Sequence, residues 1–485
     1  MKKHLIILAF VSLFSSVNAQ QALTFYNMDR VVQSQFVNPA AEIDYKFQMG
    51  GLILPLFGEM PPAMYFNYAN NSIYYNHIFH KGEGSKADSL VLDLPLMMKK
   101  LNKTTHFRFD TQFELLNLGI SLQNMYLTIS LTEKLKYGFS LPYDLFEFAI
   151  NGNIPYMKEG KPHDFKGFGL NFTHYREFAV GMSMKANEEL RLGGRMKILF
   201  GQSNFNTDIK KLSIHTDPEN YMMTWVTDMK IQTSSPLNYE YIMTPDSIHL
   251  GIDEEEFDKL QNQGAGAMAS AFLLNMKNIG IGFDLGANYK INPEIEVYGS
   301  LNDFGFINWS NNPHNFMSEG EYDFRGIEFK IFDKNENKFD ESVDNLMDTL
   351  INTFKFDLLE TSYITWLPSN LYLGGKYKFH EKLHFNVLYR GEFYRKSYLQ
   401  SLTIGASSNI TNWLAAYLTW SYANNSINNI GFGLNVRAAI FNWYIVTDSF
   451  TNMMFPQKAK NFNIRMGCNM TFGYKKIRSS ASMEM

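Results

Sequence analysis

The chain has 485 residues, with 44 Lys and Arg against 48 Asp and Glu, a formal net charge of −4 and a single cysteine. This mild charge balance suggests neither a nucleic-acid partner nor a polybasic membrane patch. One cysteine also excludes an internal disulfide framework. Aromatic residues are abundant, at 41 Phe, 27 Tyr and 6 Trp. They suit either a soluble core or the two interfacial girdles of a membrane β-barrel.

Residues 1–19 have the pattern of an export signal peptide. Lys2 and Lys3 form a short basic start, residues 5–14 form an apolar core, and residues 17–19 (Val-Asn-Ala) fit cleavage after Ala19. The alternative is an N-terminal membrane anchor, but this apolar core is too short to span a bilayer as a helix. We therefore expect an exported protein, and we expect residues 20–44 to form an N-terminal segment inside or under the domain that follows.

The remaining chain repeatedly alternates apolar and polar residues. Residues 461–474 are the clearest case, because every second residue from Phe462 to Tyr474 is apolar and every residue between them is polar or glycine. Successive side chains of a strand point to opposite faces, so this strand has one apolar and one polar face. It is longer than the ~5–6 residues of a soluble strand and long enough for the ~9–11 that cross a bilayer. The same alternation recurs in residues 178–185, 190–200, 279–291, 371–379, 383–393 and 430–438.

The segments between these strands differ in length. Short polar turns are expected at residues 187–189, 292–293, 380–381 and 411–412, and long connections at 70–106, 204–278 and 303–367. Tight turns at one end and long loops at the other are typical of outer-membrane barrels. Residues 45–474 therefore predict an all-β, transmembrane antiparallel β-barrel of about 14 strands, with 16 as the alternative, long outer loops and one or two short helices.

Three further expectations concern the ends and the loops. The last strand should close the barrel against a first strand near residues 45–56, with Cys468 as a small hydrophobe on its apolar face. Residues 475–485 should form a disordered periplasmic tail. Residues 257–274 and 341–356 have helical patterns, which form either a plug inside the barrel or a cap on an outer loop; the cap is favoured.

One hairpin carries several basic residues on its polar face: Lys185, Arg191, Arg195 and Lys197. If this face lines the lumen, it forms a basic strip that could favour anionic solutes. The alternative is that the strip pairs with a plug or with lumen carboxylates such as Asp284, Glu296 and Glu392. We favour pairing, because charges in a filled barrel must be paired or hydrated.

The sequence has no convincing catalytic or metal-binding motif. His77 and His80 are three residues apart in an aromatic, strand-like run without a third ligand, and residues 264–266 lack the lysine of a phosphate loop. Residues 333–337 resemble part of a calcium loop with Glu341 nearby, but Lys338 replaces the required glycine. We could place no Ser–His pair for a lipase. We predict no enzymatic activity, no cofactor and no metal.

Several motifs, taken in order, resemble known outer-membrane families. Residues 35–41 (Gln-Phe-Val-Asn-Pro-Ala-Ala) resemble the Asn-Pro-Ala signature near the start of FadL-like barrels. Residues 175–181 with 190–201, 280–289 with 301–309, and 366–368 resemble an uncharacterised family of Bacteroidota outer-membrane proteins. The resemblance covers residues 30–475. It implies a FadL-like or type IX secretion accessory-like barrel of about fourteen strands, and it implies no established activity.

These features together predict an integral barrel of the cell outer membrane, in contact with outer-membrane lipid. The expected function is an envelope scaffold, a docking protein or a secretion-system accessory, with envelope or secretion-complex proteins as partners. The alternative is a FadL-like conduit for small hydrophobic molecules, whose cargo the sequence does not identify. A soluble exported β binding module is a third reading, which the apolar face of residues 462–472 disfavours.

Overall fold

The computed structural model describes residues 22–51, 63–82, 89–236, 239–243, 248–252, 258–259, 262–263, 275–324, 357–394, 397–423 and 426–474. The expected signal peptide, the tail at 475–485, the motifs at 264–266 and 333–337, the helical pattern at 341–356 and most of that at 257–274 lie outside these residues. No helix in the described part of the chain has the length and hydropathy of a membrane-crossing helix.

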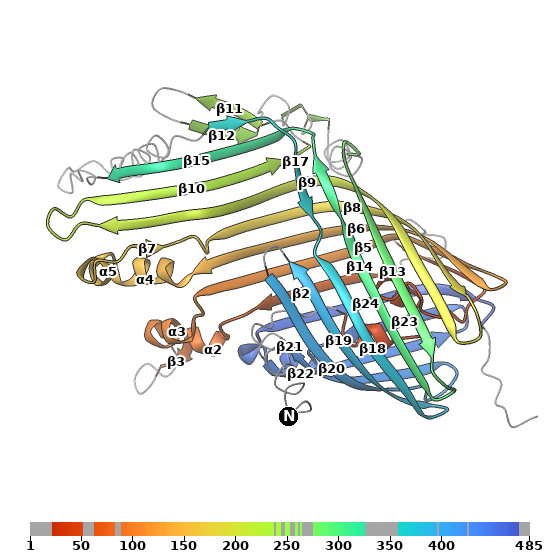
Figure 1. The fold of residues 1–485 in the computed structure, drawn as a ribbon. Helices are drawn as coiled ribbons and strands as arrows, with labels where there is room; N and C mark the ends of the chain where they lie inside the picture. The colour runs from red at the N-terminus through yellow and green to blue at the C-terminus, as the bar shows by residue number, and fades with distance from the viewer. Residues whose placement is uncertain are drawn as a thin grey trace, which may run out of the picture.

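Fourteen antiparallel strands form a closed barrel, which confirms the predicted fold class (Figure 1). The first strand has two parts, β1 and β2, and each part pairs with β24 on one side and β5 on the other. In order around the ring the strands are β1 (Phe47–Gly50) with β2 (Met64–Asn70), β5 (Thr104–Leu122), β6 (Met125–Pro142), β8 (Gly169–Lys185), β9 (Leu190–Thr216), β13 (Asn278–Lys290), β14 (Ile295–Trp309), β18 (Ser369–His380), β19 (Leu383–Tyr394), β20 (Ser397–Ser408), β21 (Leu414–Ala423), β22 (Ser426–Ala438), β23 (Phe441–Thr447) and β24 (Asn461–Phe472).

The alternation predicts the two faces of the wall correctly. On β13, Ile279 and Leu285 face outward with 55% and 60% of their surface exposed, whereas the intervening Asp284 is fully buried. Cys468 pairs with the outward-facing Trp443 but is itself only 2% exposed, so it is covered by its neighbours on that face. An apolar outer face and a polar interior are what a strand needs between lipid and a filled lumen.

The predicted short turns lie together at one end of the barrel, which we call the short-turn end. They join β8 to β9, β13 to β14, β18 to β19 and β20 to β21. The opposite, long-loop end carries short helices: α2 (Tyr75–Ile78), α3 (Leu94–Lys100), α4 (Tyr143–Asn151), α5 (Ile154–Lys158), α9 (Phe450–Met454) and the 3-10 turn η4 (Pro456–Lys458). It also carries the hairpin of β3 (Phe79–Lys81) with β4 (Leu90–Leu92), and that of β11 (Tyr239–Met243) with β12 (Ile248–Ile252).

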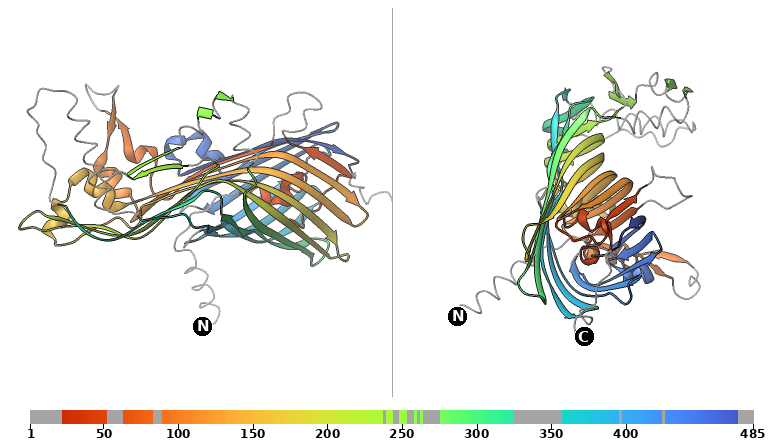
Figure 2. Two further views of the ribbon diagram at one scale, coloured as in Figure 1. Left: turned by 90° about the horizontal axis from the view of Figure 1, so that it is seen from above. Right: turned by 90° about the vertical axis from the view of Figure 1, so that its right-hand side faces the viewer.

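The prediction of a loop from residue 204 onward is wrong. Strand β9 continues to Thr216 and pairs there with an outer sheet that leaves the ring, drawn as long strands beyond the barrel in Figures 1 and 2. Part of the connection at 303–367 belongs to the same sheet. The sequence did not predict the second half of β9 or the strands within the connection at 303–367, because strands outside the bilayer need no apolar face and so their residues do not alternate. The outer sheet adds β7 (His163–Asp164), β10 (Met223–Ser234), β15 (Pro313–Phe324) and β16 (Asp357–Leu359), while β17 (Tyr363–Trp366) extends the ring beside β14.

The outer sheet branches from the ring at a small polar junction. Strand β9 pairs with β13 as far as Gly201 and with β10 from Asn204 onward. The fully buried Asn278 holds the two branches, because its Nδ2 donates to Ser234 Oγ at 3.2 Å and its Oδ1 accepts from the backbone N–H of Asn311 at 2.8 Å. The indole of Trp309 fills the space over Gly201, where an added Cβ would lie 2.6 Å from the ring.

This contact predicts that Gly201→Ala destabilises the barrel by about 1–3 kcal/mol, because Trp309 is fully buried and has no room to move. The measurement is the urea midpoint of unfolding from lipid vesicles, followed by tryptophan fluorescence. Gly282→Ala is the matched control, since its Cβ would meet Lys197 only at an ordinary 3.5 Å. Equal midpoints for the two variants would contradict the role of the junction.

Candidate functional site: the plugged lumen

Residues 22–45, which we call the plug, run through the lumen and are almost entirely buried (Figure 2). The plug contains two 3-10 turns, η1 (Phe25–Asn27) and η2 (Val32–Phe36). Its side chains hydrogen-bond to six strands spread around the ring. These contacts join Thr24 to Thr419, Tyr26 to Ser300, Asn27 to Asn386, Gln33 to both Glu114 and Asn469, and Asn38 to Asn288.

Backbone groups of the plug also have partners in the wall. Asp448, after β23, accepts hydrogen bonds from the backbone N–H groups of Leu23 at 3.2 Å and Thr24 at 2.7 Å. The carbonyl of Val37 accepts from Ser300 Oγ at 2.7 Å. Each such bond contributes about 0.5–1.5 kcal/mol, and each would cost more if broken and left buried. The plug is therefore bound as a fixed part of the structure.

Aromatic contacts fill the rest of the space between the plug and the wall. Tyr26 stacks on Tyr372 with ring centroids 4.9 Å apart and packs against Tyr298 at 5.2 Å. The guanidinium of Arg465 lies 4.5 Å from the ring of Phe25, in a cation–π geometry. This packing leaves little free volume between the plug and the wall.

Glycines let the plug backbone touch the wall directly. A Cβ on Gly193 of β9 would lie 2.1 Å from the carbonyl oxygen of Pro39, and one on Gly286 of β13 would lie 2.9 Å from the amide nitrogen of Ala40. No side chain fits in that space. The Asn-Pro-Ala motif of the sequence is therefore the part of the plug that lies closest to β9 and β13.

Beside the plug lies a buried group of charged side chains, which we call the lumen ion cluster. It contains three cations and three carboxylates: Lys134, Arg195, Lys197, Glu177, Asp284 and Asp303. Lys197 Nζ lies 2.6 Å from Asp303 and 2.7 Å from Asp284, and Arg195 Nη1 lies 3.0 Å from Asp284. Because the charges balance, the cluster can stay ionised away from water.

The strand bulge at Asp303 brings the cluster together. The pairing of β13 with β14 shifts register here, and Asp303 has a φ of 56°, in the left-handed region. Its backbone N–H donates to Asp284 Oδ1 at 2.7 Å, while its own carboxylate accepts from Lys197. Aspartate tolerates this conformation better than most residues do.

The structure divides the proposed basic strip into two pairs. Arg195 and Lys197 belong to the lumen ion cluster, and the guanidinium of Arg195 lies 4.5 Å from the ring of Phe36 in the plug. Lys185 and Arg191 lie near the short-turn end, where Lys185 pairs with Glu188 at 2.8 Å and Arg191 with Glu42 of the plug at 3.2 Å.

The three carboxylates proposed as partners have different roles. Asp284 pairs with the strip, as described. Glu392 instead joins a second buried group, in which it lies 2.7 Å from Arg108 and 3.1 Å from Arg390. Glu296 accepts a hydrogen bond from Asn288 Nδ2 at 3.1 Å.

Sequence reasoning missed Lys134, Glu177 and Asp303. Glu177 could have been predicted, because the alternation of residues 178–185, extended by one residue, places it on the polar face of that strand. Lys134 lies on β6, for which no alternation was identified, and the position of Asp303 depends on the bulge. His80 Nε2 lies 3.7 Å from Asp93 Oδ2, but the described residues contain no group of three or more His, Cys, Asp or Glu side chains placed to hold a metal ion.

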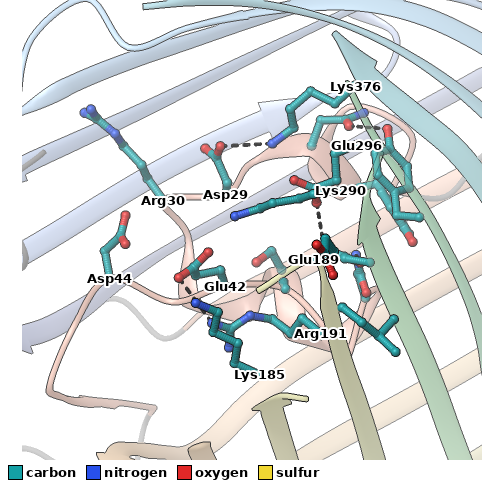
Figure 3. A pocket seen from close by; sticks show the side chains of 18 of the residues that line it. Asp29, Arg30, Glu42, Asp44, Lys185, Glu189, Arg191, Lys290, Glu296 and Lys376 are labelled. Carbon is teal, nitrogen blue, oxygen red and sulfur yellow. Dashed lines mark hydrogen bonds and ion pairs between the residues drawn. The ribbon is translucent and has the colours of Figure 1, made fainter. Parts of the chain in front are cut away.

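A charged pocket opens where the plug meets the short-turn end (Figure 3). Its volume is about 220 Å³, and both acidic and basic side chains line it. Lys376 Nζ lies 3.3 Å from Asp29 of the plug, across the pocket from the pair of Arg191 and Glu42. Lys290 and Glu296 also line this pocket (Figure 3).

The cavity between the plug and the lumen ion cluster is far smaller. It measures about 40 Å³ and lies beside Phe36, Arg195 and Asp303. That is room for about one water molecule, whose share of liquid volume is about 30 Å³. The plug and the ion cluster therefore leave this part of the lumen filled.

The close approach at Gly193 predicts that Gly193→Val displaces the plug. The expected result is faster maleimide labelling of a cysteine placed at Ala40, which is fully buried, in a Cys468→Ala background. The matched control is Gly194→Val, because Gly194 is the adjacent residue and its added Cβ would meet nothing closer than 3.7 Å. Equal labelling rates in the two variants would show that the plug does not depend on this contact.

The lumen ion cluster predicts that Asp284→Asn destabilises the barrel by about 3–5 kcal/mol, because it leaves Arg195 and Lys197 buried with too few carboxylates. Urea unfolding in vesicles measures this change. Glu188→Gln is the control. It breaks the exposed pair with Lys185, and surface pairs contribute little, so its midpoint should match that of the native protein. A native midpoint for Asp284→Asn would refute the role assigned to the cluster.

Comparisons with known proteins give one family and several distant structures. No curated protein matched the chain. A Pseudomonas aeruginosa FadL homologue is 9% identical over 91% of this chain and 94% of its own, with a TM-score of 0.38. The Ralstonia pickettii toluene transporter TbuX is 9% identical over 90% and 93%, with a TM-score of 0.38. A TodX monoaromatic hydrocarbon channel variant is 8% identical over 91% and 94%, with a TM-score of 0.40.

With sequence identities of 8–9% and TM-scores of 0.38–0.40, these structural similarities support no shared substrate. The sequence profile of a family of unknown function, DUF5723, matches residues 39–448, from the plug motif to the loop after β23. The chain belongs to the DUF5723 family.

Proposed function

We propose that this protein is a closed docking barrel of the outer membrane, which binds a segment of an envelope partner at its short-turn end and performs no catalysis. The observation that carries the proposal is the plug, which fills the lumen and is anchored to six strands around the ring. A conduit needs a continuous passage, and the cavity between the plug and the lumen ion cluster has a volume of only about 40 Å³.

The charged pocket supplies the docking surface of this proposal. Short turns of outer-membrane barrels face the periplasm, so the pocket would open toward periplasmic proteins. Six acidic and five basic side chains line it, which suits a polar peptide segment carrying charges of both signs. A partner from a secretion system would fit this role, and the link to type IX secretion stays a prediction from the sequence resemblance.

The rival function is a FadL-like conduit for small hydrophobic molecules, in which the plug moves to admit cargo. The two functions differ in what happens when the plug is fixed. The Oγ atoms of Thr24 and Thr419 are 2.7 Å apart, so cysteines at these positions can join the plug to β21 by a disulfide. A docking barrel keeps its function when locked, whereas a conduit loses it.

We predict that the native and the locked protein show no steady conductance in planar bilayers, and that deletion of residues 22–44 opens a stable pore. The pore should also sensitise cells to vancomycin. The control is the same cysteine pair in its reduced form, in a Cys468→Ala background. Passage of small hydrophobic molecules through the native protein that stops on locking would refute docking and favour the conduit.

A photo-crosslinking amino acid at the exposed Glu188 turn tests the docking surface in cells. It should capture one defined envelope protein, equally in native and locked barrels. The same amino acid at Tyr221, an exposed position in the outer β9–β10 turn, is the matched control. Capture only at Tyr221 would overturn the placement of the docking surface at the short-turn end.

A further inference from the structure

At the long-loop end, opposite the charged pocket, the wall carries an apolar cavity of about 450 Å³. It lies between the ends of β2, β5 and β24 on one side and α2, α9 and η4 on the other. Its lining is aromatic and aliphatic, and includes Ile73, Tyr74, Ile78, Phe107, Pro456 and Phe462. Contact between water and this apolar lining is unfavourable, so the cavity favours an apolar occupant.

The cavity belongs to the outward face of the barrel. Phe462 is on the apolar face of β24 and its ring lies 6.0 Å from that of Phe66, which is 38% exposed. Helix α9 lies against the same face, since Phe450 packs on the outward-facing Phe432 at 6.0 Å. Met454 and Phe455 at its end are 60% and 53% exposed. These exposed apolar groups suit the boundary between lipid and water, which aromatic girdles occupy in membrane barrels.

The cavity is held in shape by a polar loop beneath α2. Asn70 Oδ1 accepts hydrogen bonds from the backbone N–H groups of Ser72 and Ile73, both at 3.1 Å. Ser72 Oγ accepts in turn from the backbone N–H of Asn102 at 3.2 Å. The walls from β2 and β5 are thus fixed relative to each other.

Two lysines beside this cavity form no ion pair with a carboxylate in the described part of the chain. Lys460 precedes β24 and its Nζ lies 5.1 Å from the centre of the ring of Tyr74, which lines the cavity. Lys100 ends α3, which packs against α2 on the wall of the cavity. Burial and the nearby charge of Lys100 lower the pKa of Lys460. Burial and the charges of both lysines also lower the pKa of His77 in α2. Within the described residues neither lysine forms an ion pair, so a positive charge remains beside an apolar cavity.

We propose that this cavity binds an acyl chain of a phosphorylated glycolipid of the outer leaflet, with Lys100 and Lys460 binding its phosphate. An amphiphile of this class matches both halves of the site, because its chains are apolar and its head group is anionic. The lipid would fill the cavity from the membrane side and neutralise the two lysines. This inference does not depend on the proposed docking function, which concerns the opposite end of the barrel.

The test uses the full-length protein in detergent and bisphosphorylated lipid A as the probe, with native mass spectrometry as the readout. The native protein should retain lipid A, and Lys100→Glu with Lys460→Glu should weaken retention by about tenfold or more. Ala459→Trp, which fills the cavity, should have a similar effect. The matched control is Lys382→Glu, an exposed lysine in the β18–β19 turn at the opposite end, which should bind as the native protein does.

Three results would overturn the proposal: equal retention by the native protein and the cavity variants, equal retention of dephosphorylated lipid A, and equal retention of phosphatidylglycerol. Heat-dependent electrophoretic mobility shows whether each variant is folded. If the double reversal does not fold, Lys100→Gln with Lys460→Gln removes the same charges without adding new ones. The same tenfold loss is expected, and unchanged retention by that variant would refute the role of the lysines.

Discussion

The rest of this structure depends on one constraint: each membrane-crossing strand must be hydrogen-bonded along both edges, because lipid offers its backbone no partner. The chain meets this requirement with a closed ring of fourteen strands, completed where β1 and β2 join β24 to β5. A ring of about eight strands is already filled by its own side chains, whereas a ring of fourteen leaves an interior that they do not fill. The plug occupies this interior, and its buried polar groups then require hydrogen-bonding partners on the wall.

Those partners explain why charged side chains can be buried in the interior. The plug brings Asp29, Glu42 and the ring of Phe36 against inward-facing cations, while carboxylates from other strands balance the remainder. A buried cation with no carboxylate would be far costlier than a buried pair. The lumen therefore contains two charge-matched groups: the ion cluster beside β9, and the group of Arg108 and Arg390 with Glu392 and Asp110.

Much of the wall could be predicted from the sequence, and the failures have physical causes. Residues 279–291 are predicted as a strand, and β13 covers Asn278–Lys290. The prediction succeeds because a strand in contact with lipid needs an apolar outer face, which gives its sequence a clear alternation. Beyond Gly201 the strand no longer needs an apolar outer face, so the second half of β9 has no alternation that would predict it. The basic strip was visible as four residues on one hairpin, but its partners Glu177, Asp284 and Asp303 come from three strands. They meet because β8, β9, β13 and β14 are consecutive neighbours in the sheet, and that strand order is not written in the local sequence.

The plug and the seam of the barrel are one continuous piece of chain. Tyr45, the last residue of the plug, is two residues from Phe47, which pairs with Phe472 where the ring closes. The backbone of Pro39 and Ala40 meanwhile fits against glycines on β9 and β13, in the middle of the wall. Adjacent residues of one segment therefore fill the lumen and close the sheet, so a change that displaces the plug also acts on the seam of the barrel.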